Sequence, residues 1–184
     1  MTLAEFLAWE ERQELKHEFD GFGPVAMTGG TVGHSAIQTN LALSLQSRFR
    51  GQRCRFYGSD LKFLTAEGTV RYPDGMVVCG PVERSAKLVE NPVVDFGVLS
   101  PSTTRTDRIA KAHEYQASAS VQRYIMLEQE GVAAVVYARA GAVWTHEILT
   151  AESVLALPEI EVELPLAELY EGIVFETDED PETA

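Results

Sequence analysis

The chain has 184 residues, 45% of them hydrophobic and 23% charged, which is the composition of an ordinary globular protein large enough to bury one core. Its net charge of -13 argues against a general nucleic-acid coat protein, because phosphate binding needs a basic surface. No apolar run approaches the roughly 18 residues of a membrane span, and the acidic N-terminal stretch MTLAEFLAWEERQE differs from a signal peptide.

The first half of the chain predicts two helices separated by a hairpin. Residues 2–5, TLAE, fit a capping box, so a first helix is expected to run to about Lys16. Turn residues interrupt residues 17–27, which indicates a strand or a short hairpin. Beyond a Gly-rich loop, apolar residues recur every four positions, at Ile37, Leu41, Leu45 and Phe49. This spacing predicts an amphipathic helix over residues 34–49.

The rest of the chain predicts strands around one further helix. Short segments rich in aromatic and β-branched residues indicate strands at 53–57, 61–65, 70–72, 76–79, 93–99, 123–128, 133–139 and 142–147. A helix is expected over 107–117, and an alternating EIEVEL segment precedes a short helix that ends at Tyr170. This order predicts one α/β domain over residues 1–172, α+β-like in its mixed sheet, followed by a disordered acidic tail over 173–184.

The cysteines and the basic residues each lead to a simple expectation. Cys54 and Cys79 form no CxxC pair, so we expect reduced thiols and a cytoplasmic location. Five of the 15 basic residues fall in one stretch, namely Arg48, Arg50, Arg53, Arg55 and Lys62. Charge alone favours a solvated helix end and edge strand here, and a local basic face is the alternative.

An aspartate and a glycine interrupt the apolar run Val93–Leu99 within the segment PVVDFGVLSPSTTRTDRIAKAHEY. A carboxylate such as that of Asp95 is costly to bury in a strand, and a glycine such as Gly97 weakens the strand. Each residue therefore needs a specific reason to be there. The run ends at a turn rich in Ser and Thr, and the chain continues as a charged helix that holds Lys111. The segment therefore marks a candidate site.

Three charged residues are candidates for chemistry, and each has a plain structural alternative. Asp74 precedes an apolar strand, where an acid can project into a cleft and bind a hard cation such as Mg²⁺, although Pro-Asp-Gly commonly forms a turn. Lys111 could orient water or stabilise charge on a phosphate, while spacing alone favours a surface lysine. Glu18 could supply a third acid to the same cleft or lie solvated at a helix end.

The remaining motifs exclude several classes of site. His34 follows a Gly-rich loop and opens a helix, where free N–H groups could meet an anion, but the loop lacks the Lys-Ser/Thr ending of a P-loop. The other histidines form no HExxH or zinc-like spacing. Ser100 and Ser102 lie in no GxSxG context, which argues against a hydrolase serine.

The order of the motifs HEFDG, CRFYGSDLKF, RYPDGMVVC, FGVLSPSTTRTDRIAKAHEY and VQRYIMLEQ resembles the restriction-endonuclease family often called Uma-two, a branch of the PD-(D/E)XK nuclease superfamily. The similarity runs from residue 2 to residue 172. It implies a restriction-endonuclease-like core, with a mixed sheet flanked by helices and metal-binding acids on the central strands. It also implies a DNA endonuclease that uses Mg²⁺ or Mn²⁺ and forms a homodimer.

The resemblance assigns roles to five positions. Asp74 of YPD takes the place of the family's metal-binding aspartate, and Lys111 of DRIAK takes the place of its catalytic lysine. Glu18 of HEF matches a glutamate that assists as an auxiliary ligand. Arg105 and Arg108 are expected to contact the phosphate backbone of DNA.

One position departs from the family pattern, which reads EVLSPST where this chain reads GVLSPST. Gly97 has no side chain and cannot bind a cation, so two outcomes stay open. In the first, the site is degenerate, and the chain is a catalytically silent binding or regulatory module that keeps the fold; a buried ion pair between Asp95 and Lys111 would be its structural form. In the second, the metal-binding carboxylate has moved to Asp95, which shares a strand face with Gly97.

Overall fold

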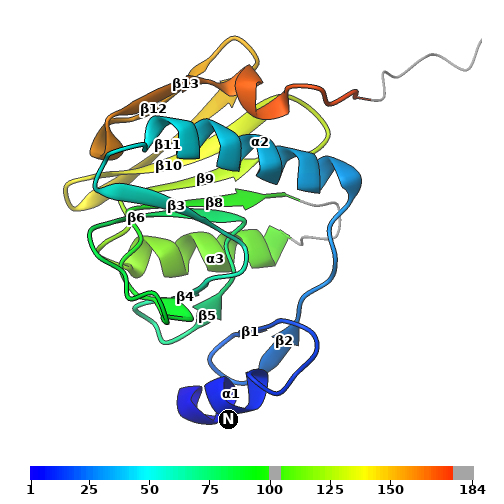
Figure 1. Ribbon diagram of the computed structural model, residues 1–184, viewed down its shortest axis with the longest axis vertical. Helices are drawn as coiled ribbons and strands as arrows, with labels where there is room; N and C mark the ends of the chain where they lie inside the picture. Colours follow the sequence, from blue (N-terminus) through cyan, green and yellow to red (C-terminus); the bar gives the residue numbers. More distant parts are fainter. Residues whose placement is uncertain (100–104, 176–184) are drawn as a thin grey trace, which may run out of the picture.

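A six-stranded mixed sheet forms the centre of the computed structural model, which describes residues 1–99 and 105–175 (Figure 1). Its strands lie in the order β11 (Val143–Thr150), β10 (Ala133–Ala140), β9 (Arg123–Leu127), β8 (Val94–Val98), β6 (Gly75–Cys79) and β3 (Cys54–Gly58). All neighbours pair antiparallel except β8 and β9, which are parallel. The strand that carries Asp95 and Gly97 therefore lies inside the sheet, between β6 and β9.

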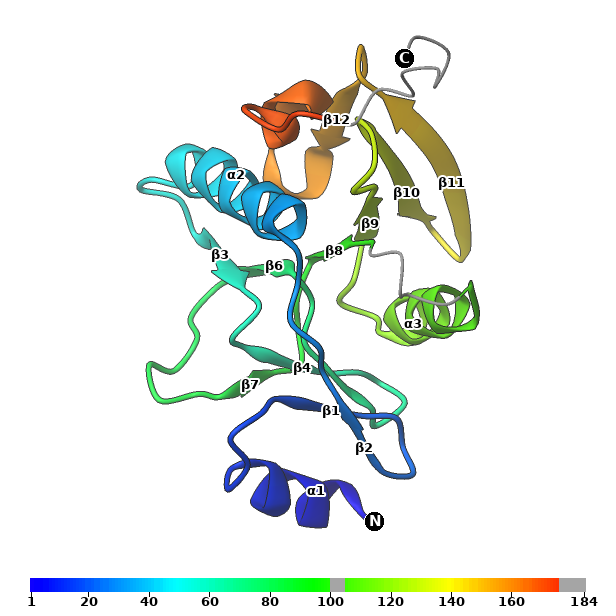
Figure 2. The ribbon, with the colours of Figure 1, turned by 90° about the vertical axis from the view of Figure 1, so that its right-hand side faces the viewer.

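Two helices cover the opposite faces of this sheet, which confirms the predicted fold class. α2 (Val32–Arg48) packs on one face and α3 (Arg105–Ala117) on the other (Figure 2). Alternation along β8 sends Val94, Phe96 and Val98 into the core under α2, so residues 95 and 97 face α3. Within the described residues, no helix has the length and apolar character needed to cross a membrane.

A second sheet and a small hairpin complete the fold. The second sheet has the strand order β2 (Pro24–Ala26), β1 (His17–Phe19), β5 (Val70–Arg71), β4 (Lys62–Leu64) and β7 (Leu88–Val89), and α1 (Leu3–Glu10) packs on it. The hairpin of β12 (Val154–Leu157) and β13 (Val162–Pro165) closes the core on the α2 side together with the 3-10 turns η1 (Pro158–Ile160) and η2 (Leu166–Tyr170). Figure 1 shows α1 and the second sheet below α3, and this brings Glu18 of β1 into contact with Lys111 of α3.

The predicted elements differ from the structure at a few places. The first helix ends at Glu10 rather than near Lys16, because the chain reverses so that His17 can begin β1 with its ring against Trp9. The sequence does not predict β7 or β12, since two or four residues are too few to establish a period. The predicted acidic tail lies outside the described residues from position 176 onward.

The expectation of two reduced cysteines is wrong. Cys54 and Cys79 face each other across the antiparallel pair β3 and β6, with a Cα–Cα distance of 3.9 Å, and they form a disulfide. Their separation of 25 residues in sequence does not reveal this pairing, because it depends on the register of the two strands. The disulfide links the edge strand β3 to the interior of the sheet under α2.

Candidate active site

Asp74 lies directly before β6, close to the start of α2. Its Oδ2 accepts a hydrogen bond of 2.6 Å from the backbone N–H of Val98, and its Oδ1 accepts one of 2.5 Å from Gln38 Nε2. His34 Nε2 lies 3.2 Å from the same Oδ1. The Pro-Asp-Gly turn therefore presents a carboxylate whose two oxygens both meet donors from neighbouring elements.

His34 is placed by the Gly-rich loop that precedes α2. Thr31 caps this helix, since its Oγ1 accepts a hydrogen bond of 3.1 Å from the backbone N–H of His34. Gly30 leaves room for the imidazole, because a Cβ at this position would lie only 2.8 Å from His34 Nδ1. The hydrogen bond with Asp74 raises the pKa of His34 and outweighs burial, which lowers it. The histidine and Asp74 therefore form a pair in which the charged imidazolium is favoured.

Glu18 belongs to a buried ion-pair network. The Arg71 guanidinium donates to both oxygens of Glu114, from Nε at 2.7 Å and from Nη2 at 2.5 Å, and its Nη1 lies 3.2 Å from Glu18 Oε2. Lys111 Nζ lies 3.1 Å from Glu18 Oε2, and the backbone N–H of Tyr72 donates to Glu18 Oε1 at 3.2 Å. Burial by itself would lower the pKa of Arg71, but the two glutamates raise it overall, so the guanidinium stays charged.

A small cavity of about 60 Å³ lies between the end of β8 and α3. Asp74, Lys111 and Arg108 line it, together with the rings of Tyr115 and Tyr124. Arg108 Nε is buried and has no hydrogen-bond partner among the described residues. The structure therefore brings three of the predicted site residues to one cavity, and Glu18 adjoins them through Lys111.

The Tyr124 side chain lies against Gly97, the position at which the resemblance implies a glutamate. A Cβ added at Gly97 would lie 3.1 Å from the hydroxyl oxygen of Tyr124 and 3.8 Å from two of its ring carbons. Tyr124 comes from β9, the parallel neighbour of β8. The contact with the hydroxyl is tight, so a side chain at position 97 would require Tyr124 to shift by a few tenths of an ångström.

Asp95 is fully buried on the α3 face of β8, where its neighbours across the sheet are Met76 and Tyr124. Neither carboxylate oxygen has a hydrogen-bond partner in the described part of the chain. Burial raises the pKa of Asp95 well above its ordinary value and favours the neutral acid. The ion pair between Asp95 and Lys111 considered above is wrong, since Lys111 contacts Glu18 instead.

The residues present do not fit a Mg²⁺ site. Mg²⁺ requires near-octahedral oxygen coordination and is usually held by one or two carboxylates in addition to water. Among the side chains that the structure describes, which exclude those of residues 100–107 and 176–184, no group of three His, Cys, Asp or Glu could hold a metal ion. Asp74 already meets three donors, and Glu18 is enclosed by Arg71 and Lys111. The resemblance implies a second carboxylate at position 97, where this chain has a glycine.

Sequence motifs point to only part of this site. They do not predict Arg71, Glu114 or Tyr124, although a charged residue inside the buried segment VRY is a signal that could have identified Arg71. The two contacts of Arg71 join positions 53 and 43 residues apart in sequence. The side chain of Arg105, at the first position of α3, is outside the part that the structure describes.

Comparisons with known proteins agree with the fold. Residues 3–167 match the model of a family described as "Putative restriction endonuclease". An uncharacterized protein of Synechocystis sp., slr1290, is 32% identical over 175 residues, which is 93% of this chain and 92% of that protein. A second one, sll1609, is 28% identical over 133 residues, or 70% of this chain and 75% of that protein. A crystal structure from Anabaena variabilis, described as "a putative nuclease belonging to DUF820", is similar with a TM-score of 0.77 at 20% identity, covering 92% of this chain and 97% of that one.

Proposed function

The chain belongs to the Uma-two family, and we propose that it is a catalytically silent member that keeps the nuclease-like fold as a binding or regulatory module. The observation that carries this proposal is the Tyr124 hydroxyl, which lies 3.1 Å from where a Cβ at Gly97 would be. Metal-dependent phosphodiester hydrolysis needs a carboxylate there to hold positive charge next to the phosphate. A phenol hydroxyl cannot replace it.

The surroundings of the two nearby acids support the same proposal. Asp74 accepts from the backbone N–H of Val98 and from the side chains of Gln38 and His34, so without a second carboxylate beside it Asp74 does not make a metal site. Asp95 is buried with a raised pKa and does not line the cavity that Asp74 lines. Neither acid therefore takes over the work of a glutamate at position 97.

A Mg²⁺-dependent DNA endonuclease is the second candidate, and one observation favours it. Asp74 and Lys111 line the same cavity, and the Asp74 side chain is 19% exposed. Its catalytic residues would be Asp74, Lys111 and Glu18, with Arg105 and Arg108 on the DNA backbone. A homodimer and a cytoplasmic location stay predictions for both candidates, although the disulfide between Cys54 and Cys79 removes the argument from reduced thiols.

Calorimetry with Mn²⁺ and Mg²⁺ separates the two candidates. We expect the chain as written to bind neither cation, and Asp74→Ala to leave this result unchanged. The double variant Gly97→Glu/Tyr124→Phe adds the carboxylate and removes the hydroxyl that lies against position 97, so we expect it to bind Mn²⁺ through positions 74 and 97.

Tyr124→Phe alone is the matched control, because it removes the hydroxyl without adding a ligand. Thermal melting by circular dichroism checks that every variant is folded. If the unchanged chain binds Mn²⁺ and Asp74→Ala abolishes this binding, the silent-module proposal is contradicted and the endonuclease is supported. In that event Asp95→Asn tests whether the buried acid contributes, and plasmid cleavage is the next assay.

A further inference from the structure

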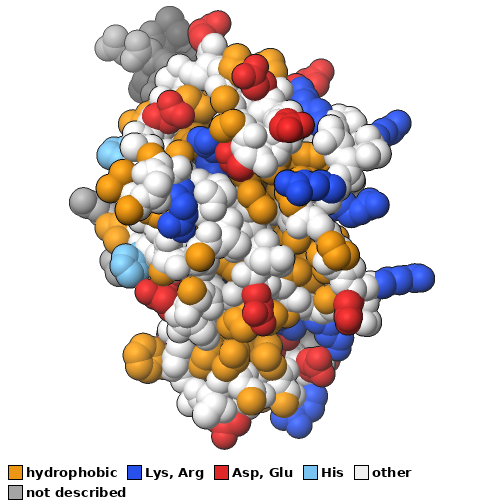
Figure 3. Space-filling model, turned by 90° about the vertical axis from the view of Figure 1, so that its left-hand side faces the viewer, with side chains coloured by type: hydrophobic (Ala, Val, Ile, Leu, Met, Phe, Trp, Pro, Cys, Tyr) orange, Lys and Arg blue, Asp and Glu red, His pale blue; other side chains and the backbone are white. Residues whose placement is uncertain are grey.

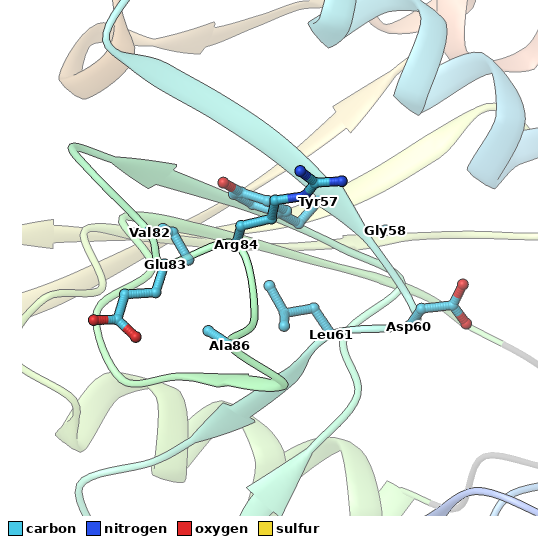
Figure 4. Close-up of a pocket in the computed structure, with 8 residues that line it drawn as sticks. All are labelled: Tyr57, Gly58, Asp60, Leu61, Val82, Glu83, Arg84 and Ala86. Carbon is cyan, nitrogen blue, oxygen red and sulfur yellow. The ribbon is translucent and has the colours of Figure 1, made fainter.

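A second cavity, of about 490 Å³, lies apart from the candidate active site, between the end of β3 and the segment that joins β6 to β7 (Figure 4). Its apolar lining consists of Tyr57, Leu61, Val82 and Ala86. The first three pack against the core cluster on the α3 side of the sheet, yet they are only partly buried. Ligand cavities in proteins commonly have this volume and this kind of lining.

The charged residues that line the cavity are Asp60, Glu83 and Arg84. Arg84 and Tyr57 line the same cavity, and Figure 4 shows the carboxylates of Asp60 and Glu83 pointing away from it. Asp60 is neutralised by a salt bridge with Lys16. Arg84 is exposed and has no ion-pair partner among the described residues. The cavity therefore offers an aromatic ring, an apolar lining and a positive charge.

A row of arginines extends from this cavity along the edge strand β3. Cys54 and Phe56 point into the core under α2, so alternation places Arg55 and Tyr57 on the other face of the strand, and Arg53 lies directly before its first residue. Along the strand, Arg55 and Tyr57 are roughly 6.5–7 Å apart. Both arginines are exposed, and neither has an ion-pair partner within the described residues.

The arginine row is a local exception in an acidic chain of net charge -13. Figure 3 shows the end of the molecule where α2 ends and β3 begins, with basic side chains along one border of that face. Arg48, in the same stretch, is paired with Glu168 at 2.7 Å, whereas no salt bridge joins Arg53 or Arg55 to an acid in the part of the chain that the structure describes. No neighbouring strand covers β3 on its outer edge among the described residues.

We propose that this surface binds single-stranded nucleic acid, with one base in the cavity against Tyr57 and successive phosphates on Arg55 and Arg53. An aromatic ring stacks on any base, and arginine binds phosphate in a bidentate manner. In a duplex the bases are stacked and paired, so a base can enter the cavity only if it is first flipped out of the helix, which costs free energy. The site uses no metal and none of the residues at Asp74, so it stands whether or not the candidate active site is silent.

Fluorescence anisotropy with a labelled oligothymidylate of about 12 nucleotides, in buffer with a chelator, tests the proposal on the full chain. We expect Tyr57→Leu to weaken binding roughly 5- to 150-fold through loss of stacking, and Tyr57→Phe to bind as the unchanged chain does. Arg55→Ala should weaken binding and reduce the slope of log K against log salt by about 0.7, the share of one phosphate contact.

Arg12→Ala is the matched control for Arg55→Ala, because Arg12 is also exposed and lies after α1, away from β3. Equal effects of these two variants would overturn the proposal, as would equal binding by Tyr57→Leu and Tyr57→Phe. A 12-base-pair duplex that binds as tightly as the single strand would also overturn it. Thymidine monophosphate is added as a competitor of the labelled strand. If it displaces the strand at the same concentration as unlabelled oligothymidylate does, the cavity is a site for free nucleotides, and the proposed strand contacts are wrong.

Discussion

Arg71→Ala is expected to lower the free energy of unfolding by about 3–5 kcal/mol. The Arg71 side chain is 6% exposed and lies between Glu18 and Glu114, which are almost as deeply buried. Its removal leaves two buried carboxylates near each other, with Lys111 as the remaining cation on Glu18. Urea denaturation followed by circular dichroism at neutral pH measures the loss.

The matched control is Arg48→Ala, which breaks another bidentate arginine–glutamate pair at a more exposed position. Arg48 and Glu168 are 29% and 31% exposed, so water screens their charges and the expected loss is at most about 1 kcal/mol. A loss at Arg71→Ala no greater than at Arg48→Ala would refute the view that the network holds the second sheet to α3. Arg71→Lys should not rescue stability, because one ammonium cannot reproduce three directed N–H groups.

Asp95→Asn is expected to remove a pH dependence of stability that the unchanged chain shows. Burial raises the pKa of Asp95 in the folded state, so the folded chain keeps a proton that the unfolded chain releases above its ordinary pKa of 3.8. The contribution of Asp95 to the free energy of unfolding is fully present at pH values below the unfolded pKa. It falls by about 1.4 kcal/mol per pH unit as the pH rises from there toward the folded pKa. Asparagine cannot ionise, so the variant lacks this slope.

Free energies of unfolding measured from about pH 5 to about pH 8 for both proteins give the difference in slope directly. Asp60→Asn is the control, because the Asp60 side chain is 95% exposed and its loss should leave the slope unchanged. Asp95→Val should also raise stability near neutral pH, since it removes a buried polar group that has no hydrogen-bond partner in the described residues. Parallel pH profiles for the unchanged chain and Asp95→Asn would mean that Asp95 ionises alike in the folded and unfolded states, contrary to this prediction.

These two predictions concern groups on the same side of the sheet. The network of Glu18, Arg71 and Glu114 joins β1, β5 and α3 through charges that satisfy one another. Asp95 lies on the adjacent β8 with no such partner among the described residues. The surface between α3 and the sheets therefore combines one satisfied polar cluster with one buried acid, Asp95, whose raised pKa favours the neutral form.

Local pattern in the sequence determined most elements of the fold. The four-residue period from Ile37 to Phe49 identified α2, and all four apolar positions are buried. Short β-branched and aromatic segments identified the strands of the central sheet. Periodicity works here because it reports which side of an element avoids water, and that property is local.

The motifs determined the family and the position at which this chain departs from it. Asp74, Lys111 and Arg108 were predicted from the sequence, and the structure places them at one cavity. The glycine at position 97 was likewise visible in the sequence as a missing carboxylate. The sequence did not show that the side chain of Tyr124 lies against this glycine.

Only the tertiary structure decided the partners. Tyr124 reaches Gly97 because β9 runs parallel to β8, Arg71 reaches Glu114 because β5 lies beside α3, and Cys54 meets Cys79 through the register of β3 and β6. Each of these contacts depends on strand order and register, which bring together residues that are distant in the chain. Hydrophobic pattern specifies which face of an element is buried, but it does not specify the neighbour that covers it.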